Sequence, residues 1–382
     1  MRSARLALAL DTGALSLPET GDIAIFAPVA GDDLTALPRD RLRLVQGFWP
    51  DHQAFARAGY SVSTDPEGPY TAVLVCVPRA KDAARAMIAE AAARVVPGGL
   101  VLVDGQKTDG IDSLLRECRA KVGIGSEVSA PVAKAHGKLF WFRADPGRFT
   151  DWAAIAAPLP VGAGLQTVPG VFSADGIDPG SAALVAALPA KLGNRVADLG
   201  AGWGYLAGEV LKRDGVKEVH LVEADHAALT LARANLGDPR ARFHWADATN
   251  IKLGSKMDTV VMNPPFHLWR AADPGLGAAF IRAAGALLTP GGVLWMVANR
   301  HLPYERVLAE TFRDVELLPG SGAYKVYRAA RPVAAAHGAV EAGRAKKSGR
   351  VEKSGRAEKS GRVEKSGRAE KSGGQSVVRT RR

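Results

Sequence analysis

The sequence predicts an α/β protein built from two tandem, Rossmann-like domains, each with a mostly parallel sheet that ends in an antiparallel strand. Short apolar runs alternate with helical patterns along most of the chain, which is typical of parallel sheets covered by helices. A glycine-rich turn follows an apolar run at residues 195–204 and opens a helical pattern. Several runs of the first half also recur in the second half, which indicates a duplicated fold.

Length and composition narrow the class of protein. A chain of 382 residues with 47% hydrophobic residues favours two domains with buried cores. No apolar run approaches the roughly 18 residues that span a membrane. Residues 1–10 have a faint signal-peptide character, but Asp11 interrupts the run and no cleavage site follows, so we expect a cytoplasmic protein. Cys76 and Cys118 lack metal-ligand spacing, so we expect buried, reduced thiols and no metal site.

Residues 1–143 are predicted to form the first domain. We expect strands at residues 22–27, 42–46, 71–77, 99–104 and 138–143, and helices at residues 51–58, 81–96 and 111–121. Alternating strands and helices predict a largely parallel sheet with both faces covered. Residues 144–170 are rich in Pro, Gly and Ala and are predicted to be a linker.

Residues 171–332 are predicted to form the second, catalytic domain. Asp178 is expected to cap a helix that starts at Pro179 and carries Leu184, Val185, Leu188 and Leu192 on one face. Strands are expected at residues 195–199, 219–222, 242–245, 258–262 and 292–297, and helices from residue 206 and at 277–288 and 304–311. A hairpin of residues 315–318 and 323–328 supplies the antiparallel end of the sheet.

The internal repeat distinguishes the two copies. Residues 94–104 match residues 286–296 in kind around a shared Pro-Gly-Gly, and residues 138–144 match residues 325–329. The first copy has Cys76-Val77-Pro78-Arg79 where the second has Asn263-Pro264-Pro265-Phe266, and it lacks an acid-plus-glycine turn after its first strand. We therefore predict a non-catalytic first copy. The alternative is that any two doubly wound domains look this similar.

The glycine turn and the acids that follow it predict a cofactor. Gly200, Gly202 and Gly204 form a G-x-G-x-G pattern two residues after Asp198, and glycines let the backbone approach a ligand closely. A dinucleotide site would require its third glycine at the position of Tyr205, so the pattern suits S-adenosylmethionine better than NAD.

Two further acids follow the next strands in order. Glu223 ends the second strand, at about the distance where an acid takes up a ribose diol. Asp247 follows the third strand, where its carboxylate can accept an adenine amino hydrogen.

The motif Asn263-Pro264-Pro265-Phe266 follows the fourth strand and predicts the methyl-accepting group. An exocyclic amino nitrogen is a poor nucleophile until it pyramidalises, and the Asn263 side-chain oxygen and the Pro264 carbonyl can accept its two hydrogens. Pro264 and Pro265 restrict the backbone and hold these acceptors in place. Phe266 offers a ring for stacking on a base. Catalysis would then rest on positioning and electrostatics, with no metal and no covalent enzyme intermediate; alone, the motif is also typical of a turn.

Three more residues are candidates for contacts in the site. Phe172, just before the Asp178 helix, can lie over the bound ligand or simply pack in its loop. His267 can line the pocket and orient the base, or lie on the surface. Lys325 belongs to the last repeated strand and is a candidate substrate contact.

Residues 335–382 differ in character from the rest. A six-residue unit of the form Ser-Gly-Arg-x-Glu-Lys repeats from Ser348, with a glycine in each unit and few apolar residues, which predicts a disordered basic tail. From Glu341 onward the tail holds 14 Lys and Arg and 5 Glu, which accounts for +9 of the net charge of +11. The tail is either a solvated segment without function or a salt-sensitive tether to RNA phosphates.

The motifs together resemble the class I ribosomal RNA guanine-N2 methyltransferases of the small subunit. The resemblance covers Pro169-Gly-Val-Phe-Ser, Asp178-Pro-Gly-Ser, Val196-Ala-Asp-Leu-Gly-Ala-Gly, Asn263-Pro-Pro-Phe-His, Val297-Ala-Asn-Arg-His-Leu-Pro-Tyr304 and Lys325-Val-Tyr-Arg-Ala329, and it is weaker in the first domain. It implies two fused copies with a degenerate first copy. It also implies that Asp198, Gly200, Gly202, Glu223 and Asp247 hold S-adenosylmethionine and that residues 263–266 hold the guanine amino group. Glu223 stands where relatives often have Asp, and the tail is not part of the family pattern.

The resemblance implies methyl transfer to the N2 amino group of a guanine in 16S ribosomal RNA, with ribosomal RNA or the small subunit as partner. We expect a monomer. The same chemistry on a 23S guanine, another RNA or DNA base, or a protein glutamine remains open, although glutamine enzymes often carry Tyr in place of Phe266. A non-catalytic RNA-binding or ribosome assembly factor is a further alternative, and the intact Asp198, Glu223, Asp247 and Asn263 argue against it.

Overall fold

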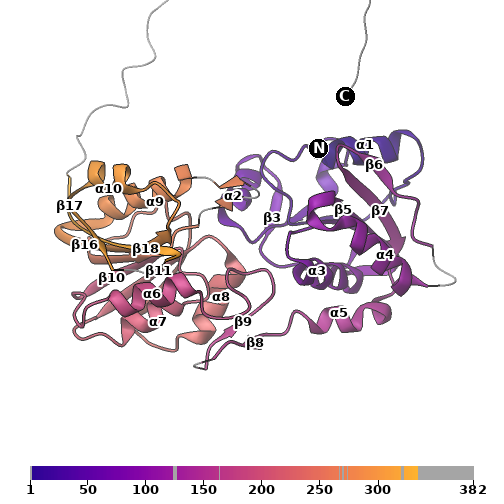
Figure 1. Ribbon diagram of the computed structural model, residues 1–382. Coiled ribbons are helices and arrows are strands. Elements are labelled where there is room, and N and C mark those ends of the chain that lie inside the picture. Colours follow the sequence, from indigo (N-terminus) through magenta and orange to yellow (C-terminus); the bar gives the residue numbers. More distant parts are fainter. Residues whose placement is uncertain are drawn as a thin grey trace, which may run out of the picture. The chain divides into compact units, whose positions relative to one another are not determined.

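The computed structural model describes residues 2–123, 127–162, 164–265, 267–268, 271–272, 274–319 and 322–333. Residues 1–335 form one compact unit that contains two seven-stranded sheets. Figure 1 shows the indigo and purple first part of the chain around one sheet and the pink and orange second part around the other. The predicted basic tail lies outside the described residues, so its predicted disorder stays a prediction.

The first sheet has the strand order β3-β2-β1-β4-β5-β7-β6. Its strands are β1 Ile23–Phe26, β2 Leu42–Val45, β3 Ser61–Ser63, β4 Tyr70–Cys76, β5 Val95–Gln106, β6 Val132–Lys134 and β7 Gly137–Arg143. The first five strands run parallel, whereas β7 pairs antiparallel with both β5 and β6.

Helices cover both faces of this sheet. They are α1 Arg2–Asp11, α2 Trp49–Arg57, α3 Lys81–Arg94, α4 Ile111–Val122 and α5 Thr150–Ala154, with short 3₁₀ turns at Arg39–Arg41, Lys107–Asp109 and Pro146–Phe149. Successive residues of a strand point to opposite faces. On β4, Val73 and Val75 therefore pack with α3 and α4, while Ala72 and Leu74 pack with α1 and α2 residues.

The second sheet has the equivalent order, β12-β11-β10-β13-β16-β18-β17. Its strands are β10 Arg195–Leu199, β11 Glu218–Glu223, β12 Ala241–Trp245, β13 Met257–Met262, β16 Leu288–Asn299, β17 Phe312–Leu318 and β18 Tyr324–Pro332. Strand β18 pairs antiparallel with both β16 and β17, and the other pairs are parallel.

The helices of the second sheet are α6 Pro179–Ala187, α7 Tyr205–Leu211, α8 His226–Asn235, α9 Pro274–Leu287 and α10 Glu305–Thr311. Helices α9 and α10 contribute Ile281 and Leu308 to the core on one face. Helices α6, α7 and α8 contribute Leu184, Val210 and Leu229 to the core on the other. Two short hairpins complete the unit: β8 Leu159–Pro160 with β9 Gln166–Thr167, and β14 His267–Leu268 with β15 Ala271–Ala272.

These sheets confirm the predicted fold class, because both are mostly parallel and both end in antiparallel strands. The duplication extends to the turn after each first strand. In the first copy Ala27 and Gly31 have φ angles of 53° and 92°, and in the second Gly200 and Gly204 have 75° and 95°. The Ala27 N–H donates to the Val45 carbonyl at 2.8 Å, as the Gly200 N–H donates to the Val222 carbonyl at 2.9 Å. The first copy thus keeps the shape of the glycine turn that its sequence does not display.

The structure differs from the predicted elements in a few places. The first residues form helix α1, which packs on the first sheet. Residues 146–154, within the predicted linker, bury Phe149 and Trp152 in the first core. Helix α6 ends at Ala187, so Leu188 and Leu192 lie beyond it, although both pack in the same core. Strands β3 and β6 are short and were not predicted, and the predicted 81–96 helix ends at Arg94 because β5 begins there.

The described residues contain neither a membrane-spanning helix nor a cluster of metal-ligating side chains. None of the helices within them is long and apolar enough to cross a bilayer. The same part of the chain contains no group of three or more His, Cys, Asp or Glu side chains placed to hold a metal ion. Cys76 and Cys118 are both buried and free.

Candidate active site

The candidate site lies where β10, β11, β12 and β13 end. Parallel strands deliver their carboxyl ends to one edge of a sheet, and a ligand binds there in an open α/β fold. A cavity of about 460 Å³ opens at this edge, within the range of roughly 300–1,000 Å³ that is usual for small-ligand sites. Its lining comprises Phe48, Pro50, Asp51, Phe172, Gly200, Gly202, Val222, Glu223, Ala224, Asp247, Ala248, Thr249, Asn263, Pro264, Pro265, Leu276 and Phe280.

The glycine turn forms one wall of this cavity. Gly200, Gly202 and Gly204 all have positive φ angles, which residues with a side chain rarely adopt. A Cβ at Gly202 would meet no atom within 4 Å, so this backbone borders open space that a ligand can fill. A Cβ at Gly204 would instead lie 3.0 Å from Leu236 Cδ1. Gly202 therefore serves the cavity, and Gly204, which does not line it, serves helix packing.

Asp198 lies beneath this turn as a fully buried carboxylate on β10. Among the described residues neither of its oxygens accepts a hydrogen bond, although the nearby Ala207 N–H favours the charged form. Burial, reinforced by the charge of Glu223, raises the pKa of Asp198 to about 8. Asp198 does not line the cavity directly. Asp198 is therefore a buried acid on the strand that leads into the glycine turn.

Glu223 joins the glycine turn to the end of β11. One carboxylate oxygen accepts the Gly202 N–H at 2.8 Å, and the other accepts the Asp225 N–H at 2.8 Å. Burial raises its pKa despite these hydrogen bonds. Each oxygen keeps a further lone pair, so Glu223 can accept hydrogens from a diol while it fixes the turn.

Asp247 lies in the loop after β12. Its Oδ1 accepts hydrogen bonds from the Thr249 backbone N–H at 2.8 Å and the Thr249 hydroxyl at 2.6 Å. Its Oδ2 accepts none from the described residues, and Asp247 lines the cavity. The carboxylate is therefore held by one oxygen while the other remains available to a ligand donor.

Asn263, at the end of β13, has a fixed orientation. Its Nδ2 donates to Asp178 Oδ2 at 2.8 Å and to the Ser181 hydroxyl at 2.9 Å. Asp178 also caps helix α6 by accepting the Ser181 N–H at 2.7 Å. Because two acceptors hold the amino end of the amide, its carbonyl oxygen Oδ1 is directed elsewhere and accepts no hydrogen bond from the described residues. The sequence predicts the Asp178 cap but not its contact with Asn263.

The rest of the predicted motif is only partly described. Pro264 and Pro265 both line the cavity beside Asn263. Phe266 lies outside the described residues. The backbone of His267 belongs to β14, and its side chain is outside the described part.

Phe172 lies at the rim of the cavity. Its side chain is 56% exposed, and its carbonyl accepts the Trp203 indole N–H at 3.0 Å. Lys325, in contrast, does not line the cavity. Its amine pairs with Glu305 and donates to the Leu302 carbonyl at 3.4 Å. The substrate contact expected of Lys325 stays a prediction.

The structure adds residues that no motif indicates. Thr249, Leu276 and Phe280 line the cavity from the second domain, and Phe48, Pro50 and Asp51 line it from the first. Apolar and aromatic wall residues carry no spacing signature, because only the tertiary fold brings them together. The contribution of the first domain had no signal in the sequence.

Comparisons with known proteins show which sequences and structures this chain is similar to. Residues 162–328 match the model of the methyltransferase small domain family. The chain is 27% identical over 263 residues to ribosomal RNA small subunit methyltransferase C of Shewanella loihica, covering 68% of this chain and 76% of that protein. It is 35% identical over 177 residues to the protein of the same name from Erwinia tasmaniensis, covering 45% of this chain and half of that protein.

A solved structure shows the same fold. The T. thermophilus 16S rRNA N2 G1207 methyltransferase, in complex with AdoMet and guanosine, superposes with a TM-score of 0.68 at 24% identity. The match covers 85% of this chain and 91% of that one, so it includes both sheets. The family resemblance that the motifs indicate is confirmed.

Proposed function

We propose that this S-adenosylmethionine-dependent methyltransferase, which carries a methyltransferase small domain and resembles the ribosomal RNA small subunit methyltransferase C proteins, methylates the exocyclic N2 amino group of a guanine in 16S ribosomal RNA. The observation that carries the proposal is the orientation of Asn263. Asp178 and Ser181 hold its amide nitrogen, so its Oδ1 is the end available to the cavity. The Asn263 Oδ1 can only accept a hydrogen bond, so it suits a substrate amino group, which has two hydrogens to donate.

The cofactor is held by the glycine turn and the two acids that follow it. S-adenosylmethionine, when bound, supplies a methyl group on a positively charged sulfur that leaves as a neutral thioether. Gly202 leaves room for it along the turn. Glu223 accepts a hydrogen of the ribose diol, and the free Oδ2 of Asp247 accepts an adenine amino hydrogen. The cavity fits these roles, because both acids line it and each has acceptor capacity left.

Asn263 and Pro264 prepare the guanine amino group. The Asn263 Oδ1 and the Pro264 carbonyl oxygen each accept one amino hydrogen, which withdraws the nitrogen from conjugation and turns its lone pair toward the glycine turn. The new nitrogen–carbon bond would form as the sulfur–carbon bond breaks, and the methylated nitrogen would then lose one proton to water. The contribution of the enzyme is positioning and electrostatic stabilisation, since the leaving group is already good.

The guanine must reach the cavity unpaired. A base within a duplex cannot present its amino group to Asn263, so the target nucleotide is single-stranded or flipped out. The exposed ring of Phe172 at the rim offers a stacking surface for such a base. We propose ribosomal RNA or the small subunit as the partner, and a monomer as the acting form.

The proposal is tested on ribosomal RNA from cells that lack this protein. The purified full chain is incubated with that RNA, free or in subunits, and with S-adenosylmethionine labelled in the methyl group, and the digested nucleosides are analysed by mass spectrometry. We expect label in N2-methylguanosine from the small-subunit RNA. Label in another nucleoside, or in the large-subunit RNA, would show that the substrate differs from the proposed one. Label in protein alone would point to an amide acceptor.

A further inference from the structure

The first domain contributes to the wall of the cofactor cavity. Phe48, Pro50 and Asp51 line the cavity together with Glu223 and Ala224 of the second domain. Phe48 precedes helix α2, and Pro50 and Asp51 lie in its first turn. A degenerate copy that served only as a support would have no reason to bring an acidic side chain to this place.

Backbone contacts fix this segment against the cofactor site. Phe48 and Asp225 form an isolated antiparallel bridge. The Trp49 N–H donates to the Ala224 carbonyl at 2.8 Å, and the His226 N–H donates to the Gly47 carbonyl at 2.9 Å. Ala224 directly follows Glu223, so helix α2 begins beside the acid expected at the cofactor ribose.

Trp245 reinforces the same contact. Its indole N–H donates to the Ala224 carbonyl at 2.9 Å and to the Gly47 carbonyl at 3.1 Å. Its ring packs edge to face on Trp49, with 4.7 Å between the ring centroids. The start of α2 is therefore held at the ends of β11 and β12, on the side of the cavity away from Asn263.

Asp51 is a buried carboxylate with one oxygen free. Asp51 is only 6% exposed, and its Oδ1 accepts the Ala30 N–H at 2.9 Å. Its Oδ2 is buried and has no hydrogen-bond partner among the described residues. Buried polar atoms are almost always partnered, and an unpaired buried carboxylate is costly. Burial accordingly raises the pKa of Asp51.

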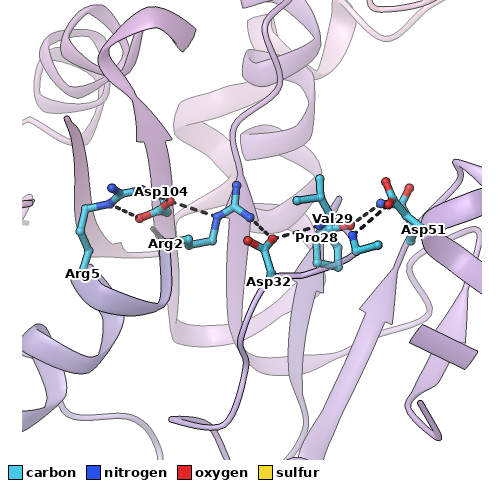
Figure 2. Close-up of polar contacts among 9 residues, drawn as sticks. Arg2, Arg5, Pro28, Val29, Asp32, Asp51 and Asp104 are labelled. Carbon is cyan, nitrogen blue, oxygen red and sulfur yellow. Dashed lines mark hydrogen bonds and ion pairs between the residues drawn. The ribbon is translucent and has the colours of Figure 1, made fainter. Parts of the chain in front are cut away.

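A chain of polar contacts behind Asp51 sets its position, as Figure 2 shows. Asp104 pairs with Arg5 and Arg2 of helix α1, and Arg2 also pairs with Asp32. The same Asp32 oxygen accepts the Val29 N–H at 3.0 Å. The next residue, Ala30, donates to Asp51 Oδ1, so the contacts that hold the loop after β1 at Val29 also set the position of the Asp51 carboxylate.

We propose that Asp51 is a cofactor-binding residue contributed by the first domain, and that its Oδ2 accepts a hydrogen bond from a ribose hydroxyl of S-adenosylmethionine. A carboxylate only accepts, and a hydroxyl is the donor that the ribose offers beside Glu223. Each oxygen of Glu223 already accepts one backbone N–H, so we assign one ribose hydroxyl to Glu223 and the other to Asp51. The inference deepens the proposed cofactor site and does not depend on which nucleotide is methylated.

The test measures ligand binding by the full chain without RNA. Asp51→Asn keeps the shape of the side chain. The Ala30 N–H needs the amide oxygen, so the NH₂ group takes the place of Oδ2 and cannot accept a hydrogen bond. We expect S-adenosylhomocysteine to bind about 10- to 100-fold more weakly, the range for losing a hydrogen bond to a charged group. The matched control is Asp40→Asn, which removes the same charge at an exposed site of the first domain and should change the affinity less than about twofold.

Deoxy ligands locate the contact. The 2′-deoxy and 3′-deoxy forms of S-adenosylhomocysteine are compared on wild type and Asp51→Asn. The ligand that lacks the hydroxyl contacted by Asp51 should bind wild type and Asp51→Asn with the same affinity, because the hydrogen-bond donor for Asp51 is already absent from it. If Asp51→Asn does not fold, Asp51→Ala gives the same comparison, because an alanine side chain cannot accept a hydrogen bond.

Three results would overturn the inference. One is wild-type affinity for S-adenosylhomocysteine in Asp51→Asn, and another is an equal loss for all three ligands. The last is a change confined to the KM for RNA, which would place Asp51 at the base. Failure of guanine methylation would leave these binding results untouched, so the two proposals fail separately.

Discussion

At the residue scale, the amide of Asn263 is the group on which the proposed chemistry depends. We expect Asn263→Ala to lower kcat by about 10²–10³-fold, the cost of removing one preorganised polar group. Its affinity for S-adenosylhomocysteine should change by less than about threefold, because the glycine turn, Glu223 and Asp247 remain. Single-turnover methylation and calorimetric binding measure the two effects separately. Wild-type turnover in this variant would remove Asn263 from the mechanism.

Asp198 makes stability depend on pH. Its pKa is raised from about 3.9 to about 8 by burial in the folded state, so the native state binds a proton that the unfolded state releases between these values. The stabilising contribution of this group is therefore complete below about pH 4 and is lost as the pH rises through about 8.

Asp198→Asn removes this dependence and keeps the shape. We expect wild type and variant to have similar unfolding free energies near pH 4, and the variant to be more stable by a few kcal/mol at about pH 9. The slope that Glu223 and Asp225 contribute should persist in the variant, because burial raises their pKa values as well. Urea unfolding at several pH values measures this, and parallel curves for both proteins would contradict the raised pKa of Asp198.

Much of the site at this scale could be predicted, because strand ends and glycine spacing are local features. Gly200, Gly202, Glu223, Asp247 and Asn263 all line one cavity, as expected of residues at successive strand ends. The orientation of Asn263 could not be predicted, since its partner Asp178 is 85 residues away. The pairing of the Lys325 amine with Glu305 in the fold has no signal in the sequence either.

At the scale of elements, helix α1 is tied to the first sheet by buried charges. The Arg5 guanidinium donates to both Asp104 oxygens at 2.7 Å, and both residues are fully buried. We expect Asp104→Ala to destabilise the protein by about 3–5 kcal/mol, because it leaves a buried arginine uncompensated.

Urea denaturation measures the loss of unfolding free energy in Asp104→Ala and compares it with the loss of a surface ion pair. Glu310→Ala breaks an exposed pair with Arg306 and should cost less than about 1 kcal/mol. An Asp104→Ala variant as stable as Glu310→Ala would show that α1 is held by apolar contacts alone.

Helix α1 also shows why some elements escape prediction. Residues 1–10 look like a weak signal sequence because their apolar residues are dense, and nothing local shows that Arg2 and Arg5 have a partner at Asp104. Strand β4 was predicted well, because its apolar run is buried on both faces. Strands β5 and β16 extend beyond the predicted residues 99–104 and 292–297 at both ends. Strands β3 and β6, each three residues long, lack such a pattern. Helix α5 was hidden in a segment whose composition suggested a linker.

At the scale of the whole molecule, the two copies meet through equivalent segments. In the first copy Gln46 stands after β2 where Glu223 ends β11. Its Oε1 accepts the Phe48 N–H at 2.7 Å, as Glu223 accepts that of Asp225, and its amide nitrogen donates to the Pro28 carbonyl. In the first copy, Gln46, which stands at the position of Glu223, therefore makes its hydrogen bonds within its own domain. The residues that follow it, Phe48, Pro50 and Asp51, line the cavity of the second copy.

The basic tail is expected to act on RNA affinity alone. Deleting residues 341–382 removes a net charge of +9. We expect weaker RNA binding at low salt and a shallower dependence of log Kd on log salt, because fewer phosphate counterions are released. Affinity for S-adenosylhomocysteine should stay unchanged. Filter binding at several salt concentrations measures this, and an unchanged salt slope would identify the tail as a segment without a role in RNA binding.

The duplication could be predicted at this scale, since repeated Pro-Gly-Gly segments and terminal strands mark both copies. The contact between the copies could not. It depends on Trp49, Trp245 and backbone groups of Gly47 and Ala224, none of which belongs to a repeated motif. Asp51 therefore looks like an ordinary first-turn helix residue until the fold places it at the cavity.

The central claim is that Asn263 and Pro264 hold the N2 amino group of a guanine. It is tested most directly with a small-subunit RNA fragment that carries the mapped target guanosine, compared with the same fragment carrying inosine, which lacks only that amino group. We expect methyl transfer to the guanosine fragment, none to the inosine fragment, and similar binding of both. Equal methylation of the inosine fragment would contradict the account, because the methyl group would then be going to another atom.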